Sequence, residues 1–213
     1  MDGDDSSTDW LYAGGTDVHE VAERYDRWAD EYDTDIRSWS YAAPEIVAEI
    51  AAAHVAPESS VLDAGCGTGL VGTALRAAGL CGEIVGIDVS AASLRIAERT
   101  GAYTSVAVAD LQQSLPAADD RFGAVVCVGV MTYVPDVEAA WREFARVVRP
   151  GGVVVVTQRD DLWEPRGCQA AIDRLAAEGV WTPVEITGPQ PYLPGNTEGM
   201  GPVGVRYVTA RAG

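Results

Sequence analysis

Short apolar runs alternate with segments of helical period through most of the chain. The apolar runs predict strands at residues 60–64, 83–87, 104–109, 122–128 and 153–158. The run at 122–128 is almost wholly apolar, as expected for a central parallel strand, and 153–158 is predicted to be another buried strand. Between them, apolar residues recur every three or four positions and predict helices over 69–78, 91–99, 137–148 and 165–178. This alternation indicates an α/β protein with a parallel sheet covered by helices on both faces.

Both ends of the chain depart from the alternation. Residues 1–15 are acidic and polar and end in two glycines, so we expect a disordered acidic tail. Asp17 and Glu20 have capping-box spacing and predict a helix over 18–32, and Pro44 suits the first turn of a second helix over 44–54. Residues 181–187 and 203–210 predict a final antiparallel hairpin. We therefore expect one domain over 16–213, with N-terminal helices at 16–57 and a Rossmann-like core at 58–213.

Composition narrows the classes of partner. The formal net charge is −17, which disfavours nucleic acids because their phosphates would be repelled. The four cysteines form no Cys-x-x-Cys pair, so we expect no metal site. No apolar run approaches the ~20 residues of a membrane span, and the first residues are neither basic nor apolar. We therefore expect a cytoplasmic protein without a membrane partner.

A glycine-rich loop follows the first predicted strand. It reads Asp63-Ala-Gly65-Cys-Gly67-Thr-Gly69 and leads directly into a helix. Glycine allows unusual torsions and close approach of a ligand to the backbone. The spacing differs from the dinucleotide pattern G-x-G-x-x-G, because residue 70 is leucine. Asp63 also adds a carboxylate where a pyrophosphate would lie, which favours a ligand with a cationic group.

Three further strand ends carry residues suited to a nucleoside. Asp88 ends the second predicted strand 23 residues after Gly65, about the spacing at which a carboxylate accepts hydrogen bonds from ribose. Asp110 and Leu111 follow the third strand and suit an adenine amino group and ring. Gly129 follows the fourth strand, at the switch point of such a sheet. Each residue alone fits a cap or a turn, but together they predict a nucleoside site, and S-adenosylmethionine adds the cationic amino and sulfonium groups.

These motifs resemble the class I S-adenosylmethionine-dependent methyltransferases. The segments 25–33, 41–44 and 66–71 are similar to the Williams–Beuren-region methyltransferase-like proteins. The resemblance implies a Rossmann-like three-layer sandwich with a seven-stranded, mostly parallel sheet in the order 3-2-1-4-5-7-6, strand 7 antiparallel, and an N-terminal helical lid. It implies S-adenosylmethionine as cofactor, near Tyr25, Asp63, Gly65, Cys66, Gly67, Leu70, Asp88, Val89, Asp110, Leu111, Gly129 and Val130.

The reaction itself is less marked in the sequence. No general base stands out. Tyr133, after the fourth strand, could donate a hydrogen bond to a substrate oxygen; alternatively, it is an aromatic residue packed in a loop. Arg159, after the fifth strand, could bind a substrate carboxylate; alternatively, it is a solvated charge on the surface. We expect methyl transfer to a small-molecule acceptor. The alternatives are a non-methylating use of the cofactor, as in a cyclase, or a non-catalytic S-adenosylmethionine-binding regulatory protein; an NAD-dependent oxidoreductase is disfavoured by the glycine spacing.

Overall fold

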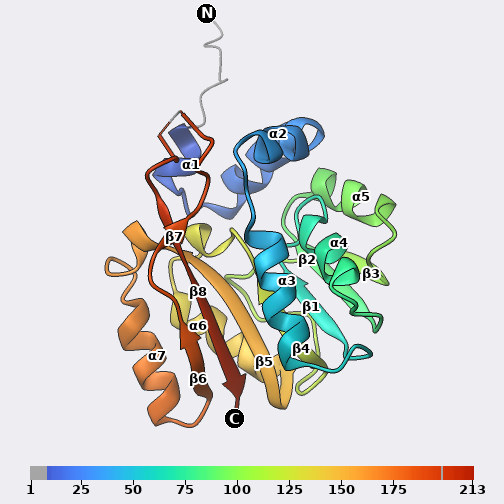
Figure 1. Ribbon diagram of the computed structural model, residues 1–213, viewed down its shortest axis with the longest axis vertical. Helices are drawn as coiled ribbons and strands as arrows, with labels where there is room; N and C mark the ends of the chain where they lie inside the picture. Colours follow the sequence, from blue (N-terminus) through green and yellow to red (C-terminus); the bar gives the residue numbers. More distant parts are fainter. Residues whose placement is uncertain (1–8, 198) are drawn as a thin grey trace, which may run out of the picture.

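The computed structural model describes residues 9–197 and 199–213, and its centre is one mixed sheet (Figure 1). Five parallel strands come first along the chain: β1 (Val61–Ala64), β2 (Ile84–Asp88), β3 (Ser105–Val108), β4 (Phe122–Cys127) and β5 (Val148–Arg159). They are followed by β6 (Trp181–Ile186), β7 (Gln190–Pro191) and β8 (Gly204–Ala212). The order is β3-β2-β1-β4-β5-β8-β6, and β8 is antiparallel to both neighbours.

This topology confirms the expected order, with β8 as the predicted seventh strand. The additional strand β7 is only two residues long and pairs with the start of β8. It lies in the glycine- and proline-rich segment, where no apolar period predicted a strand.

Helices cover both faces of the sheet and make three layers (Figure 1). One face carries α3 (Ala43–His54), α4 (Leu70–Ala77) and α5 (Ala91–Arg99), and the other carries α6 (Val137–Val147) and α7 (Cys168–Ala177). Strand β5 is buried on both sides: Val154 belongs to the apolar cluster beneath α6 and α7, and Val155 to the cluster beneath α3 and α4. Two 3-10 turns, η1 (Met131–Tyr133) and η2 (Asp160–Leu162), follow β4 and β5.

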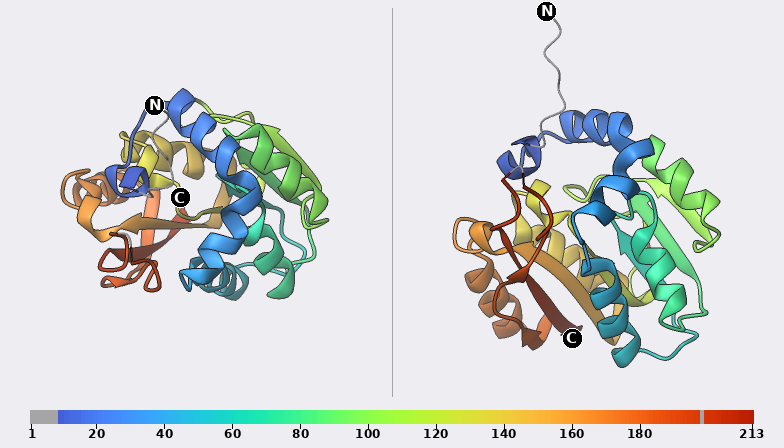
Figure 2. Two further views of the ribbon diagram at one scale, coloured as in Figure 1. Left: turned by 90° about the horizontal axis from the view of Figure 1, so that it is seen from above. Right: turned by 45° about the horizontal axis from the view of Figure 1, so that its top comes forward.

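The N-terminal helices lie across the edge where the parallel strands end (Figure 2). Helix α2 spans Val18–Ser38 and is longer than predicted; its N-cap is Asp17, whose carboxylate accepts from the amides of His19 and Glu20. The prediction of disorder was wrong for α1 (Asp9–Ala13), because Leu11 is buried and the Trp10 ring packs edge-on against Trp28 of α2. Residues 1–8 of the predicted tail lie outside the described residues.

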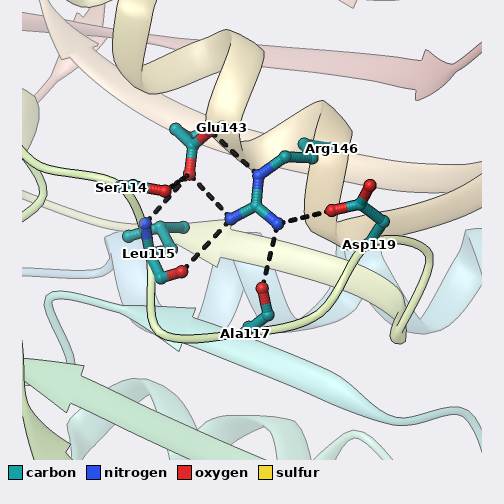
Figure 3. Close-up of polar contacts among 6 residues, drawn as sticks. All are labelled: Ser114, Leu115, Ala117, Asp119, Glu143 and Arg146. Atoms are coloured by element: carbon teal, nitrogen blue, oxygen red, sulfur yellow. Dashed lines mark hydrogen bonds and ion pairs between the residues drawn. The ribbon is translucent and has the colours of Figure 1, made fainter.

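The connection from β3 to β4 is a loop that α6 holds in place (Figure 3). Arg146 of α6 donates hydrogen bonds to the carbonyls of Leu115 and Ala117 and to the carboxylates of Asp119 and Glu143. Glu143 in turn accepts from the amide of Leu115, and its hydrogen bonds with Arg146 lower its pKa to about 2. The network fixes the loop that begins with the predicted adenine-binding residues.

Candidate functional site

A cavity of about 60 Å³ lies between the glycine loop, the end of β2 and helix α2. Its wall combines backbone of the glycine loop with apolar and aromatic side chains of the lid. The lining residues are Val21, Tyr25, Tyr32, Gly65, Gly67, Thr68, Asp88, Val89, Ser93 and Val130. We call this the cofactor cavity.

Asp88 ties the two strand ends together at this cavity. One carboxylate oxygen accepts from the amide of Gly67 at 2.8 Å, and the other accepts from the amide of Ser90 at 2.8 Å. Burial raises the pKa of Asp88, and these hydrogen bonds oppose that shift. The carboxylate therefore holds the glycine loop against β2 and forms part of the cavity wall.

The loop glycines differ in what they permit. A Cβ on Gly65 would lie 2.2 Å from a methyl group of Val130, so this glycine lets the loops after β1 and β4 approach each other. Gly67 has a φ of +50°, and a Cβ there would meet nothing within 4 Å. Because Gly67 also lines the cofactor cavity, its missing side chain leaves backbone open to a ligand.

Asp63 is fully buried beneath the loop. Its Oδ2 accepts from the hydroxyl of Tyr103 at 2.7 Å, and no hydrogen bond to Oδ1 is found within the described part of the chain. Burial raises the pKa of Asp63 to about 7, and the bond from Tyr103 opposes the rise. A cationic group beside this carboxylate would stabilise its ionised form, which fits the amino group of S-adenosylmethionine.

Helix α2 is fastened over the cavity at two points that sequence reasoning missed. Asp26 accepts from the hydroxyl of Ser90 at 2.6 Å and from the amide of Ala92 at 2.9 Å, at the start of α5. Asp33 accepts from the hydroxyl of Thr68 in the glycine loop at 2.6 Å. Since the predicted helix ended at residue 32, its sequence gave no signal for the second contact.

A second, aromatic cavity of about 30 Å³ adjoins the first and shares Tyr25 and Tyr32 with it. The hydroxyls of Tyr25 and Tyr133 lie 3.0 Å apart, and Arg159 forms part of the wall at 3% exposure. The lining residues are Leu11, Tyr25, Trp28, Tyr32, Ile36, Tyr41, Gly129, Thr132, Tyr133, Arg159, Tyr192, Leu193 and Met200. Arginine and tyrosine are the only titratable types among them, and burial raises the pKa of Tyr25, Tyr133 and Tyr192.

The structure gathers half of the predicted cofactor residues at the cofactor cavity: Tyr25, Gly65, Gly67, Asp88, Val89 and Val130. Gly129 lines the aromatic cavity instead, where a Cβ would lie 2.9 Å from the hydroxyl of Tyr41. Leu111 lines a separate depression of about 280 Å³ beside α6, and Asp110 accepts from the amide of Gln112. Cys66 packs under α5, and Leu70 packs against the lid aromatics.

The residues that sequence reasoning missed come mainly from the lid and the C-terminal segment. Val21, Thr68 and Ser93 complete the cofactor cavity together with Tyr32. Tyr41 and Tyr192 both line the aromatic cavity, where their rings pack edge to face with centroids 5.4 Å apart. The aromatic stripe on α2 was the available signal for Tyr32. Among residues 9–197 and 199–213, His, Cys, Asp and Glu form no cluster suited to a metal ion. In the same residues no helix is long and apolar enough to pass through a bilayer.

Comparison with known proteins agrees with this geometry. Residues 62–156 match the family described as "Methyltransferase domain". The chain is 32% identical over 182 residues to human methyltransferase-like protein 27, covering 79% of this chain and 71% of the relative. It is 37% identical over 102 residues to the ubiquinone biosynthesis O-methyltransferase of Alkalilimnicola ehrlichii, covering 45% of this chain and 39% of that protein.

Two solved structures show the same fold. An S-adenosylmethionine-dependent methyltransferase of Thermotoga maritima, described as a possible histamine N-methyltransferase, superposes with a TM-score of 0.63 at 18% identity over 89% of this chain and 98% of the other. The cyclase SpnF superposes with a TM-score of 0.61 at 20% identity over 79% and 81%. The glycine loop, the strand order and the similarity to human methyltransferase-like protein 27 together show that the chain belongs to the class I S-adenosylmethionine-dependent methyltransferases, with S-adenosylmethionine as its cofactor.

Proposed function

We propose that this protein transfers the methyl group of S-adenosylmethionine to a small-molecule acceptor bound in the aromatic cavity. The observation that carries the proposal is that the two cavities share Tyr25 and Tyr32 as a common wall. Methyl transfer requires the donor and the acceptor to meet in line at close range, so adjoining cavities suit it. The similarity to a ubiquinone biosynthesis O-methyltransferase supports a small-molecule acceptor.

The donor side follows from the polar groups around the cofactor cavity. Asp63 would hold the methionine amino group, Gly67 would offer open backbone beside the methionine part, and Asp88 would accept from the ribose hydroxyls. Val89 and Val130 supply apolar wall for the adenine. The cofactor brings the activated methyl group, and these residues orient it and exclude water.

The acceptor side supplies orientation without a strong base. No carboxylate, histidine, cysteine or lysine lines the aromatic cavity in the described residues. The hydroxyls of Tyr25 and Tyr133 keep their protons at neutral pH because burial raises the pKa of both, so they act as hydrogen-bond donors and acceptors. Reactivity then depends on an acceptor that is already electron-rich, with Tyr133 placed to bond its nucleophilic atom.

The structural similarity to SpnF keeps a non-methylating use of the cofactor as a second candidate. The two functions differ in their products. Incubation with S-adenosylmethionine and a panel of small acceptors should yield S-adenosylhomocysteine and a product heavier by one methyl group. A cyclase would convert substrate without change of mass and without S-adenosylhomocysteine, and a regulatory protein would bind the cofactor without turning over any acceptor.

Calorimetric titration with S-adenosylmethionine should precede the panel, with NAD as the control ligand. Asp88→Ala should weaken S-adenosylmethionine binding at least tenfold, because it removes the ribose-binding carboxylate and the bond to Gly67. Tyr133→Phe should lower kcat with little effect on cofactor binding. Unchanged turnover by the Tyr133→Phe variant would contradict the role given to that hydroxyl.

A further inference from the structure

The guanidinium of Arg159 is buried at the end of β5 and donates hydrogen bonds from two of its edges. Nε and Nη2 donate to the two carboxylate oxygens of Asp161 at 3.0 and 2.6 Å. On the other edge, Nη1 donates to the carbonyl of Leu11 at 2.7 Å, and Nη2 donates to the carbonyl of Tyr12 at 3.1 Å. The second pair of acceptors belongs to α1, whose residue Leu11 lines the aromatic cavity.

Two carbonyl oxygens on one edge of a guanidinium have the arrangement of the two oxygens of a carboxylate. Arginine binds carboxylates through such paired donors, and an ionised acceptor makes a bond roughly twice as strong as a neutral carbonyl. Helix α1 has five residues, too few to be stable alone. A carboxylate that reached this edge of Arg159 would therefore displace the carbonyls of Leu11 and Tyr12.

The walls of the aromatic cavity suit a planar, uncharged body, although its volume of about 30 Å³ would have to grow by displacement of α1 before a ring could enter. Tyr25, Trp28, Tyr32, Tyr41 and Tyr192 supply rings and hydroxyls, and Arg159 is its only cation among the described residues. Aromatic side chains bind flat ring systems by offset and edge-to-face contacts. One end of the cavity thus suits a carboxylate, while its walls suit an aromatic ring.

A groove of about 490 Å³ lies beyond Arg159 and offers a route to the cavity. It is lined by Tyr12 and Asp161, which both contact Arg159, together with Asp160 and residues near the start of β8. Both aspartates are paired with arginine: Asp160 accepts from Arg206 at 2.6 Å, and Asp161 accepts from Arg159. Displacement of Tyr12, whose side chain is mostly exposed, would join the groove to the aromatic cavity.

We propose that the methyl acceptor is a small aromatic carboxylic acid, whose carboxylate replaces the carbonyls of Leu11 and Tyr12 on Arg159. This inference rests on the proposed function and names the substrate class of the same cavity. The carboxylate anchors the acceptor, and α1 occupies its place until it binds. A separate oxygen or nitrogen on the ring, beside Tyr133, would form the new bond to the methyl carbon as the sulfur–carbon bond breaks to leave S-adenosylhomocysteine, and any proton on that atom would pass to water.

The probes are benzoate and 2-naphthoate, with the matching amides as neutral controls and benzylamine as a cationic control. Each is titrated calorimetrically into the full chain saturated with S-adenosylhomocysteine. At least one acid should bind, at least tenfold more tightly than its amide, and benzylamine should not bind. Arg159→Gln should weaken acid binding at least tenfold while S-adenosylhomocysteine still binds.

A second variant tests whether α1 competes with the carboxylate for Arg159 or whether Arg159 only supports the fold around the cavity. Trp10 anchors α1 through edge-on ring contacts with Tyr25 and Trp28, and it does not line the aromatic cavity. Trp10→Ala should therefore free Arg159 and tighten acid binding severalfold, opposite in sign to Arg159→Gln. Equal binding of acids and amides, preference for benzylamine, or no acid binding by a protein that binds S-adenosylhomocysteine would overturn the inference. Failure to bind S-adenosylhomocysteine would count instead against the proposed function.

Discussion

Asp63 is buried beneath the glycine loop, and its Oδ1 accepts no hydrogen bond within the described part of the chain. Burial raises its pKa from 3.8 to about 7, so between these values the folded protein keeps a proton that the unfolded chain releases. The free energy of unfolding must then fall as pH rises through this range, by about 1.4 kcal/mol per pH unit from this residue. The destabilisation is complete above pH 7 and absent below about pH 4.

Asp63→Asn should remove this pH dependence from the cofactor-free protein. Between pH 5 and pH 7 the variant should gain on the order of 2 kcal/mol in unfolding free energy relative to the parent protein, measured by urea denaturation. Glu49→Gln makes the same change in net charge at an exposed position on α3 and serves as the control. A difference between Asp63→Asn and parent that stays constant with pH would show that Asp63 is ionised throughout.

Gly67 tests whether the open space at the glycine loop is the cofactor site. Alanine at its φ of +50° costs about 1 kcal/mol of stability, and the new methyl group points into open space at the cavity. Gly67→Ala should therefore weaken S-adenosylmethionine binding at least tenfold by calorimetry. Gly79→Ala, at a φ of +93° and also in open space, should cost similar stability without affecting the cofactor. Equal effects of the two variants on binding would refute the assignment.

Single residues could be predicted from the sequence where their positions depend on local structure. Gly65 and Gly67 lie in the loop that directly joins β1 to α4, and Asp88 ends β2, the next strand along the chain. Tyr41 and Tyr192 are 151 positions apart and meet only because the C-terminal segment folds back over the strand ends. No local pattern marks such a pair, so the aromatic cavity could not be read from the sequence.

At the scale of elements, the predicted strands β1 to β5 and helices α3 to α7 are confirmed. The apolar runs of β1, β2, β4 and β5 match their burial, whereas β3 lies at the edge of the sheet and is mostly exposed. Helix α1 was missed, since five residues within an acidic segment carry no period and owe their structure to packing on α2. The conformation of the loop between β3 and β4 was also not predicted, because it depends on long-range hydrogen bonds from Arg146 of α6.

This loop predicts a contrast between two arginines of α6. Arg146→Ala should lower the unfolding free energy by about 2 kcal/mol. The substitution removes the hydrogen bonds to the carbonyls of Leu115 and Ala117, and it leaves the carboxylate of Glu143 without the guanidinium that it binds. Arg142→Ala removes exposed ion pairs to Glu138 and Glu178, which solvent screens, and should cost clearly less stability than Arg146→Ala. If the two variants lost similar unfolding free energy in urea denaturation, the role of Arg146 in holding the loop would be contradicted.

For the whole molecule, alternation of strands and helices was enough to predict three layers, and the family resemblance implied the strand order. It was not enough to predict how closely the N-terminal helices close over the sheet. The cofactor cavity encloses about 60 Å³, far below the roughly 300 Å³ or more of sites for ligands of cofactor size. We therefore expect α2 to move outward when S-adenosylmethionine binds, which would open its contacts with α5 and the glycine loop.

Amide hydrogen exchange tests this motion across the chain. Peptides from α2 should exchange faster than those from β4 and β5 in the free protein, because α2 packs on one side only and the two strands are buried. Adding S-adenosylhomocysteine should slow exchange in α2, whose Tyr25 and Tyr32 line the cofactor cavity, and leave the two strands unchanged. Asp26→Ala removes the bonds to Ser90 and Ala92, so it should speed exchange in α2 of the free protein and enlarge the protection on binding. Protection confined to the strands, with α2 unaffected by the ligand, would mean that α2 is a fixed wall of the site.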